Sequence, residues 1–216
     1  MRFKKNDKLV MIGDSITDCG RNRPVGEGIG DPYGKGYVSL VDGLLKTVYP
    51  ELAIRVVNMG TSGNTVRDLA ERWQKDVLDL KPDWLSVMIG TNDVWRQFDQ
   101  PYIPESHVYP EEYEATLDEL VAKTKMRVKG IVLMTPFYLE PNRSDPMRAT
   151  MDRYGEIVKR VAERHGTVFV DTQAAFDEVL AHIYPAALAW DRVHPSMAGH
   201  ATLARAFLQA VGFVWQ

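Results

Sequence analysis

The chain has 216 residues, of which 45% are hydrophobic and 25% charged, and these values are typical of one globular domain spanning residues 1–216. A net charge of −3 gives no electrostatic reason to expect nucleic acid or an anionic membrane as a partner. The single cysteine excludes an intrachain disulfide, and no apolar run has the length of a signal-peptide core or a membrane span, so we expect a cytoplasmic protein with no membrane partner.

Short apolar runs alternate with helical patterns along the chain. The runs are rich in Val, Ile, Leu and Met, as expected for strands that are buried on both faces. They cover residues 8–12, 54–58, 84–89, 131–134 and 168–170. Helical patterns cover residues 66–80, 111–125, 151–164, 171–183 and 197–211. This alternation predicts a mostly parallel sheet flanked by helices, with ligands bound beyond the carboxyl ends of the strands.

Polar residues follow the first three runs. Ser15 would stand where the first strand turns into a helix, with its hydroxyl exposed. Gly63 lies in the loop after the second run and can present a free N–H, while Asn92 after the third run offers an uncharged amide donor. Each also has an ordinary structural explanation, namely a helix cap for Ser15, a tight turn around Gly63 and an Asx turn at Asn92.

Asp191 and His194 form the pattern Asp-x-x-His near the C-terminus. In one compact turn the carboxylate can accept the Nδ1 proton of the imidazole and leave Nε2 to face outward. This arrangement would supply a general base and the group that orients it. A solvated ion pair on a surface turn is the alternative explanation.

Taken together, these segments resemble the four sequence blocks of the SGNH hydrolases, also called the GDSL esterase/lipase family. The blocks are Gly13-Asp14-Ser15, Gly63, Gly90-x-Asn92-Asp93 and Asp191-x-x-His194, in the order of that family. The longer string from Ile12 to Asp18, followed by Gly20-Arg21, is similar to the branch that contains intracellular acetyl xylan esterases.

The resemblance implies a three-layer α/β/α sandwich with a five-stranded parallel sheet, as in flavodoxin-like folds. It implies Ser15 as nucleophile, His194 as base and Asp191 as the orienting acid. It also implies an oxyanion hole made by the Ser15 N–H, the Gly63 N–H and the Asn92 side chain, with Gly60 as a weaker candidate than Gly63. Members of the family need neither a metal nor an organic cofactor.

The expected function is therefore removal of acetyl groups from acetylated xylo-oligosaccharides or related sugars through an acyl-enzyme. A lipid-directed (lysophospholipase-like) or general short-chain esterase is one alternative, and a carbohydrate-binding module without catalysis is another. Metal-assisted hydrolysis would need Asp14, Asp18, Asp191 and His194 as ligands, and their spacing does not match a known metal site.

Three further residues are candidates for substrate contact: Asp14, Trp95 and Trp190. The aromatic residues within 95–109, together with Tyr184 and Trp190, suit either stacking on a sugar ring or a subunit interface. Because the apolar C-terminal segment 213–215 must also pack against something, we expect a homo-oligomer. Cys19 is expected to be a packed small side chain.

Overall fold

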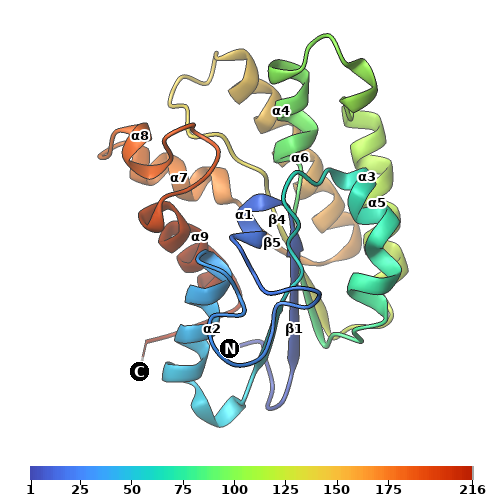
Figure 1. The fold of residues 1–216 in the computed structure, drawn as a ribbon, viewed down its shortest axis with the longest axis vertical. Helices are drawn as coiled ribbons and strands as arrows, with labels where there is room; N and C mark the ends of the chain where they lie inside the picture. The colour runs from blue at the N-terminus through green and yellow to red at the C-terminus, as the bar shows by residue number, and fades with distance from the viewer. Residues whose placement is uncertain (216) are drawn as a thin grey trace.

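The computed structural model describes residues 1–215 and contains a five-stranded parallel sheet in the order β2-β1-β3-β4-β5 (Figure 1). The strands are β1 (Lys8–Gly13), β2 (Arg55–Asn58), β3 (Trp84–Met88), β4 (Gly130–Met134) and β5 (Val168–Val170). Val10 in the inner strand β1 pairs with Val57 on one side and Leu85 on the other. Each predicted apolar run forms a strand, and the predicted α/β fold is confirmed.

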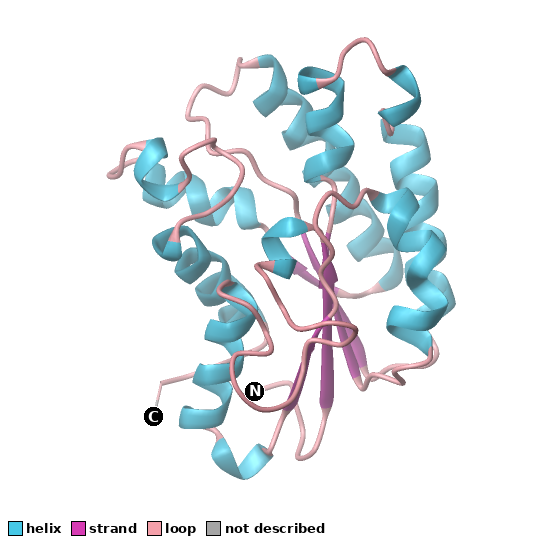
Figure 2. Cartoon of the chain, in the orientation of Figure 1, coloured by secondary structure: helices cyan, strands magenta, loops and turns pink. Residues whose placement is uncertain are grey.

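Helices cover both faces of this sheet and make three layers (Figure 2). Alternate residues of β1 point to opposite faces: Leu9 and Met11 join one apolar core, and Val10 and Ile12 join the other. The first core is closed by α2 (Tyr37–Val48), α7 (Thr172–Leu180) and α9 (Met197–Ala210). The second is closed by α3 (Val66–Trp73), α5 (Pro110–Lys125) and α6 (Pro146–His165).

The helices differ from the sequence prediction mainly by additions. The predicted helix 66–80 is α3 continued by a turn of π-helix (Gln74–Leu78), and the predicted helix 151–164 begins earlier, at Pro146. The helix expected to begin at Ser15 is the short α1 (Ser15–Asp18), and the additional helices are α2, α4 (Thr91–Asp99) and α8 (Pro185–Leu188). None of the helices in the described part of the chain has the length and apolar character needed to cross a bilayer.

The strand order places a change of direction between β1 and β3. The chain moves from β1 outward to β2 on one side, then returns to β3 and continues outward through β4 to β5. At such a point the connections after the two central strands leave toward opposite faces, which opens a crevice at the carboxyl edge. Short helix α1 lies at this edge, above the end of β1 (Figure 1).

Candidate active site

Ser15 is the first residue of α1, directly beyond the end of β1. The Asp14 side chain caps this helix, because its Oδ1 accepts a hydrogen bond from the Ile16 N–H at 3.0 Å. A side chain at Gly13 would place its Cβ 2.3 Å from the Met88 carbonyl oxygen, so only glycine fits there. The Gly-Asp-Ser sequence therefore turns the chain from strand into helix and holds Ser15 at the edge of the sheet.

The Ser15 hydroxyl is hydrogen-bonded to His194, which is hydrogen-bonded to Asp191. Ser15 Oγ lies 3.0 Å from His194 Nε2, and His194 Nδ1 lies 2.6 Å from Asp191 Oδ2. Both distances are within the range needed for proton transfer. With its Nδ1 proton directed at the carboxylate, the imidazole presents Nε2 as the acceptor of the Ser15 proton. The structure thus brings the three predicted residues together.

The Asp191 carboxylate is fixed by the turn that it begins. Its Oδ1 accepts the backbone N–H groups of Val193 at 2.9 Å and His194 at 2.7 Å. Burial opposes ionisation, but the hydrogen bonds from the His194 ring and these two N–H groups lower the pKa of Asp191 below its ordinary value. The side chains of His194 and Asp191 are 46% and 38% exposed, so the triad opens directly to solvent.

The loop after β2 presents one backbone N–H that is free to bind a ligand, that of Gly63. Every other N–H from 61 to 66 has an acceptor: Gly13 O for Thr61, Asp18 Oδ2 for Ser62, Thr61 O for Asn64, Asp68 Oδ2 for Thr65 and Asp93 Oδ1 for Val66. The Gly63 N–H has no acceptor within residues 1–215, and its φ of +83° suits glycine. Gly60 donates its N–H to Asn58 Oδ1 at 2.8 Å, so the geometry favours Gly63 as the free donor.

Asn92 and Ser15 offer two further N–H donors. Asn92 Nδ2 donates one hydrogen to the Asn64 carbonyl oxygen at 2.9 Å, and Asn92 Oδ1 accepts from Arg96 Nη2 at 3.2 Å. These bonds fix the direction of the amide and leave its second Nδ2 hydrogen for a ligand. The Ser15 N–H has no acceptor in the described part of the chain. Free donors thus follow the ends of the three adjacent strands β2, β1 and β3.

Two buried carboxyl groups, Asp14 and Asp93, belong to residues directly next to Ser15 and Asn92 in the chain. Burial raises the pKa of Asp14 to about 6, against the opposing effects of the Ile16 N–H and the charge of His194. Burial also raises the pKa of Asp93 to about 7. Because Asp14 is only 1% exposed and caps α1, its position does not favour the direct substrate contact predicted from the sequence.

The two candidate tryptophans occupy different positions. Trp95 on α4 meets the imidazole of His194 edge to face, with ring centroids 5.7 Å apart. Trp190 directly precedes Asp191, but its side chain is 90% exposed. Tyr184, at the start of α8, is exposed as well. Trp95 therefore contacts the triad through His194, whereas the Trp190 side chain next to Asp191 projects into solvent.

Cys19 and a metal site were the other chemical possibilities near Ser15. Cys19 Sγ lies 3.4 Å from His200 Nε2, and burial raises the pKa of the thiol to about 12, which makes it a poor nucleophile. Within residues 1–215, no group of three or more His, Cys, Asp or Glu side chains is arranged to hold a metal ion.

Asp18 and Arg72 support this site, and neither was predicted to do so from the sequence. Asp18 Oδ2 accepts hydrogen bonds from the Ser62 N–H at 3.0 Å and the Ser62 hydroxyl at 2.9 Å, next to Gly63. Arg72 on α3 contacts the same loop at Asn64. The available signal was a charged residue, Arg72, at the border of an otherwise apolar helix face.

Residues 11–202 match the model of the GDSL-like lipase/acylhydrolase family, and the chain belongs to this family. The matched range includes all the residues that the sequence resemblance placed in the triad and the oxyanion hole. The predicted SGNH/GDSL membership is thereby confirmed.

Among its relatives is an acetylxylan esterase from Geobacillus stearothermophilus, 65% identical over 215 residues that cover 100% of this chain and 98% of the relative. The crystal structure of Axe2, an acetylxylan esterase from that organism, matches this chain with a TM-score of 0.98 over the same shares. Three solved variants of Axe2, S15A, D191A and H194A, are described as catalytic mutants, and Ser, Asp and His stand at these numbers here. The alpha/beta hydrolase LAE5 from the Lake Arreo metagenome is 59% identical, with a TM-score of 0.97 and 98% of each chain covered.

Proposed function

We propose that this chain is a serine esterase that removes acetyl groups from acetylated xylo-oligosaccharides or related sugars. The observation that carries the proposal is the hydrogen-bonded series from Ser15 through His194 to Asp191, beside N–H groups that have no acceptor of their own. The 65% identity to an acetylxylan esterase supports both the acetyl group and the sugar.

In the first half of the reaction, Ser15 Oγ attacks the ester carbonyl carbon while His194 Nε2 takes up the hydroxyl proton. Asp191 keeps the imidazole in place and stabilises its charged form. The Ser15 and Gly63 N–H groups and Asn92 Nδ2 bind the developing oxyanion, each such donor being worth roughly 10²–10³ in rate. His194 then protonates the sugar oxygen, the C–O bond breaks and the acetyl group remains on Ser15.

Water completes the second half. His194 Nε2 takes a proton from the water as its oxygen attacks the acetyl carbonyl, and the same donors bind the second oxyanion. The proton returns to Ser15 Oγ as acetate leaves. Every step uses side chains and N–H groups of this chain, and the family resemblance implies no metal or organic cofactor.

Sugar binding is assigned to the aromatic side chains that flank the triad. Trp95 borders His194, and Trp190 presents an exposed ring one residue before Asp191. Aromatic rings offer a flat apolar surface together with a polar edge, which suits the alternating faces of a sugar.

The decisive experiment measures acetate release from peracetylated xylose by the wild type, Ser15→Ala and the control Ser106→Ala. Wild type and control should release acetate, and Ser15→Ala should lose at least about 10³ in rate. Turnover of simple short esters but not of the sugar, still dependent on Ser15, would retain the esterase and discard the sugar. Absence of any Ser15-dependent turnover would overturn the proposal in favour of a binding module.

Acyl preference is tested with 4-nitrophenyl esters of increasing chain length. We expect the highest kcat/KM for acetate, with a decline for longer chains. A maximum of kcat/KM for acyl chains of about eight or more carbons would instead favour the lipid-directed alternative.

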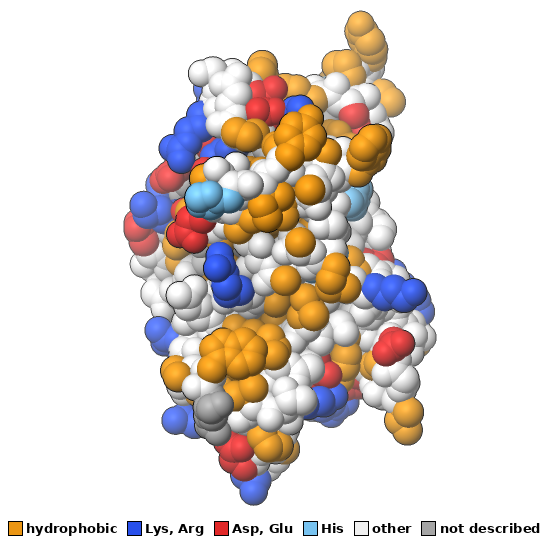
Figure 3. All heavy atoms as spheres, turned by 90° about the vertical axis from the view of Figure 1, so that its left-hand side faces the viewer, with side chains coloured by type: hydrophobic (Ala, Val, Ile, Leu, Met, Phe, Trp, Pro, Cys, Tyr) orange, Lys and Arg blue, Asp and Glu red, His pale blue; other side chains and the backbone are white. Residues whose placement is uncertain are grey.

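We also propose that the chain forms a homo-oligomer. Hydrophobic side chains gather on the face formed by α2 and α9 (Figure 3). A groove of about 770 Å³ lies on this face, lined mainly by Leu40, Leu44, Leu208, Phe213 and Trp215, and Trp215 is 69% exposed. Light scattering at micromolar concentration tests this, and a monomeric mass would contradict it.

The cytoplasmic location stays a prediction.

A further inference from the structure

Arg72 is a largely buried cation on α3, beside the ends of β1 and β2. Its side chain is 16% exposed, and burial lowers the pKa of the guanidinium against the opposing effect of Asp76. A buried guanidinium is tolerated only where its N–H groups find acceptors. The acceptors of Arg72 therefore indicate which parts of the molecule it holds in place.

Four of the five guanidinium N–H groups have an acceptor. Nη2 donates to the Gly13 carbonyl oxygen at 2.9 Å, and Nη1 donates to the Met59 carbonyl oxygen at 2.7 Å and to Asp76 Oδ2 at 2.9 Å. Nε donates to Asn64 Oδ1 at 2.6 Å. One side chain thus joins the strand end before the nucleophile to the loop that carries the free N–H.

Asn64 extends this connection to Asn92. The Asn64 side chain accepts from Arg72, whereas the Asn64 carbonyl oxygen accepts from Asn92 Nδ2 at 2.9 Å. Asn64 also directly follows Gly63 in the chain. A shift of Asn64 would therefore move the Gly63 N–H and remove the bond that directs the Asn92 amide.

We propose that Arg72 is a positioning residue of the oxyanion hole, acting through Asn64 on the donors of Gly63 and Asn92. This inference rests on the proposed ester hydrolysis. Donors stabilise an oxyanion only when they are held about 2.7–3.1 Å from its position. Arg72 takes no part in the hydrogen bonds of the triad, so its loss leaves Ser15 activated. What is lost is stabilisation of the tetrahedral intermediate.

The test compares Arg72→Met with the wild type, using 4-nitrophenyl acetate as substrate and methylboronic acid as a tetrahedral analogue that bonds to a serine hydroxyl. Arg72→Met should lower kcat by roughly 10²-fold, the loss expected for displaced oxyanion donors, and should change KM by less than about threefold. Binding of the boronic acid should weaken in parallel with kcat. A variant that only folds less completely would also lose kcat at unchanged KM, but its folded fraction would bind the boronic acid as tightly as the wild type does.

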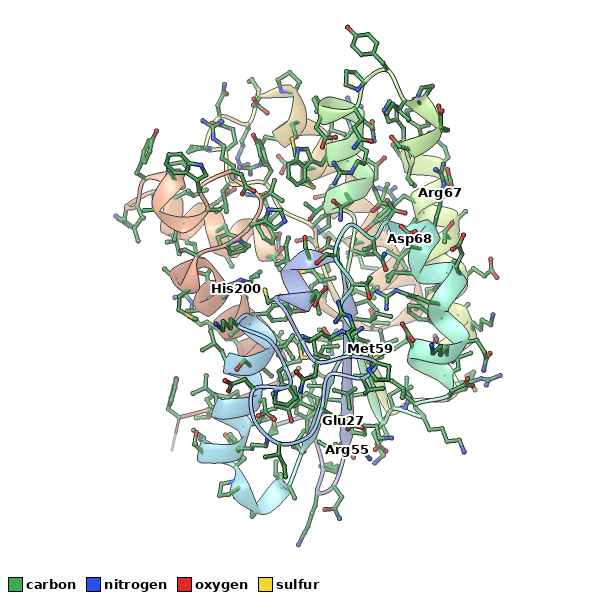
Figure 4. The ribbon with its side chains drawn as sticks, viewed as in Figure 1. Glu27, Arg55, Met59, Arg67, Asp68 and His200 are labelled. Atoms are coloured by element: carbon green, nitrogen blue, oxygen red, sulfur yellow. The ribbon has the colours of Figure 1, made fainter. Side chains whose placement is uncertain are left out.

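Arg67→Met is the matched control on the same helix. The Arg67 guanidinium bonds to Glu112 and to the carbonyl oxygens of Glu105 at 2.9 Å and His107 at 2.8 Å. It points toward α5 and away from Met59 (Figure 4). Its kcat should equal that of the wild type. Arg72→Lys should recover only part of the loss, because an ammonium keeps the charge but not the planar set of donors.

Asn64→Ala keeps the test decisive if Arg72→Met does not fold. It removes the Oδ1 acceptor from a loop and retains the carbonyl oxygen that Asn92 uses, and kcat should fall about 10-fold at unchanged KM. Wild-type kcat in folded Arg72→Met or Asn64→Ala, or an equal loss in Arg67→Met, would overturn the inference. Failure of the proposed function is recognised separately, because wild type and Ser15→Ala would then hydrolyse the ester equally slowly.

Discussion

The indole ring of Trp95 packs edge to face against the imidazole of His194, with ring centroids 5.7 Å apart and the ring planes at 62°. The triad is otherwise open to solvent, with the His194 side chain 46% exposed. A half-exposed imidazole can rotate away from its partners unless a neighbour restricts it. Trp95 supplies that restriction and keeps Nε2 directed at Ser15.

Replacement of Trp95 by leucine should therefore lower kcat. Aromatic pairs of this geometry are worth about 0.5–1.5 kcal/mol, which corresponds to a decrease of about 2–12-fold. Steady-state kinetics with 4-nitrophenyl acetate measure the effect. Phe213→Leu is the control, because it removes an edge-to-face contact with Tyr49 far from the triad. A change in KM alone would show that Trp95 contacts the substrate without restricting His194.

The two glycines of the loop after β2 should respond differently to alanine. At Gly63 an added Cβ meets open space but φ is +83°, so Gly63→Ala should cost about 1–2 kcal/mol of unfolding free energy and lower kcat as the N–H shifts. At Gly60 the Cβ would stand 2.2 Å from the Asp18 backbone nitrogen, and Gly60→Ala should not fold. Urea unfolding and kcat distinguish them. A folded, inactive Gly60→Ala beside an active Gly63→Ala would transfer the donor role to Gly60.

Replacements within the triad should not be additive. Asp191→Asn keeps the size of the side chain but changes which ring nitrogen of His194 carries the proton. It should lower kcat by about 10²–10⁴, less than Ser15→Ala. The double variant Ser15→Ala/His194→Ala should be no slower than Ser15→Ala, since the base has no task without the nucleophile. Long-term assays of acetate release by these three variants, by His194→Ala and by the wild type measure the losses. Fully additive losses would contradict a shared catalytic unit.

The sheet and the triad were predictable because their signals are local. Each strand contains a short apolar segment between turns, and Asp191 and His194 meet within one turn of the chain. Helix α4 was not predicted because its first turn contains Asn92 and Asp93, polar residues typical of a turn, which the structure buries. Helix α2 begins after Gly36, which provides no side-chain cap to indicate its start.

The supports of the site depend on contacts that no local pattern shows. Arg72 reaches Gly13, 59 residues away in the sequence, and the choice between Gly60 and Gly63 depends on which N–H already has an acceptor. Sequence spacing places both glycines at the strand end. The family resemblance favoured Gly63, and the folded loop gives the physical reason: the Gly60 N–H is bonded to Asn58, whereas the Gly63 N–H has no acceptor within residues 1–215.

Asp93 should make the stability of the protein depend on pH. Its carboxyl is buried, Oδ1 accepts the Val66 N–H at 2.9 Å, and Oδ2 has no partner within residues 1–215. Burial raises its pKa from 3.8 to about 7, so the folded state binds this proton more tightly than the unfolded state. The contribution of Asp93 to the unfolding free energy should therefore be highest at low pH and should decrease as pH rises from about 4 through about 7.

Asp93→Asn should remove this decrease, because an amide keeps an oxygen for the Val66 N–H and does not ionise. Urea unfolding at pH 5 and pH 8 measures the change. The difference in unfolding free energy between the two pH values should shrink by about 1–3 kcal/mol relative to wild type, since each pKa unit corresponds to about 1.4 kcal/mol. Part of the decrease should persist in the variant, because burial also raises the pKa of Asp14, to about 6. An identical pH dependence in Asp93→Asn and wild type would show that Asp93 is ionised in the folded protein across this range.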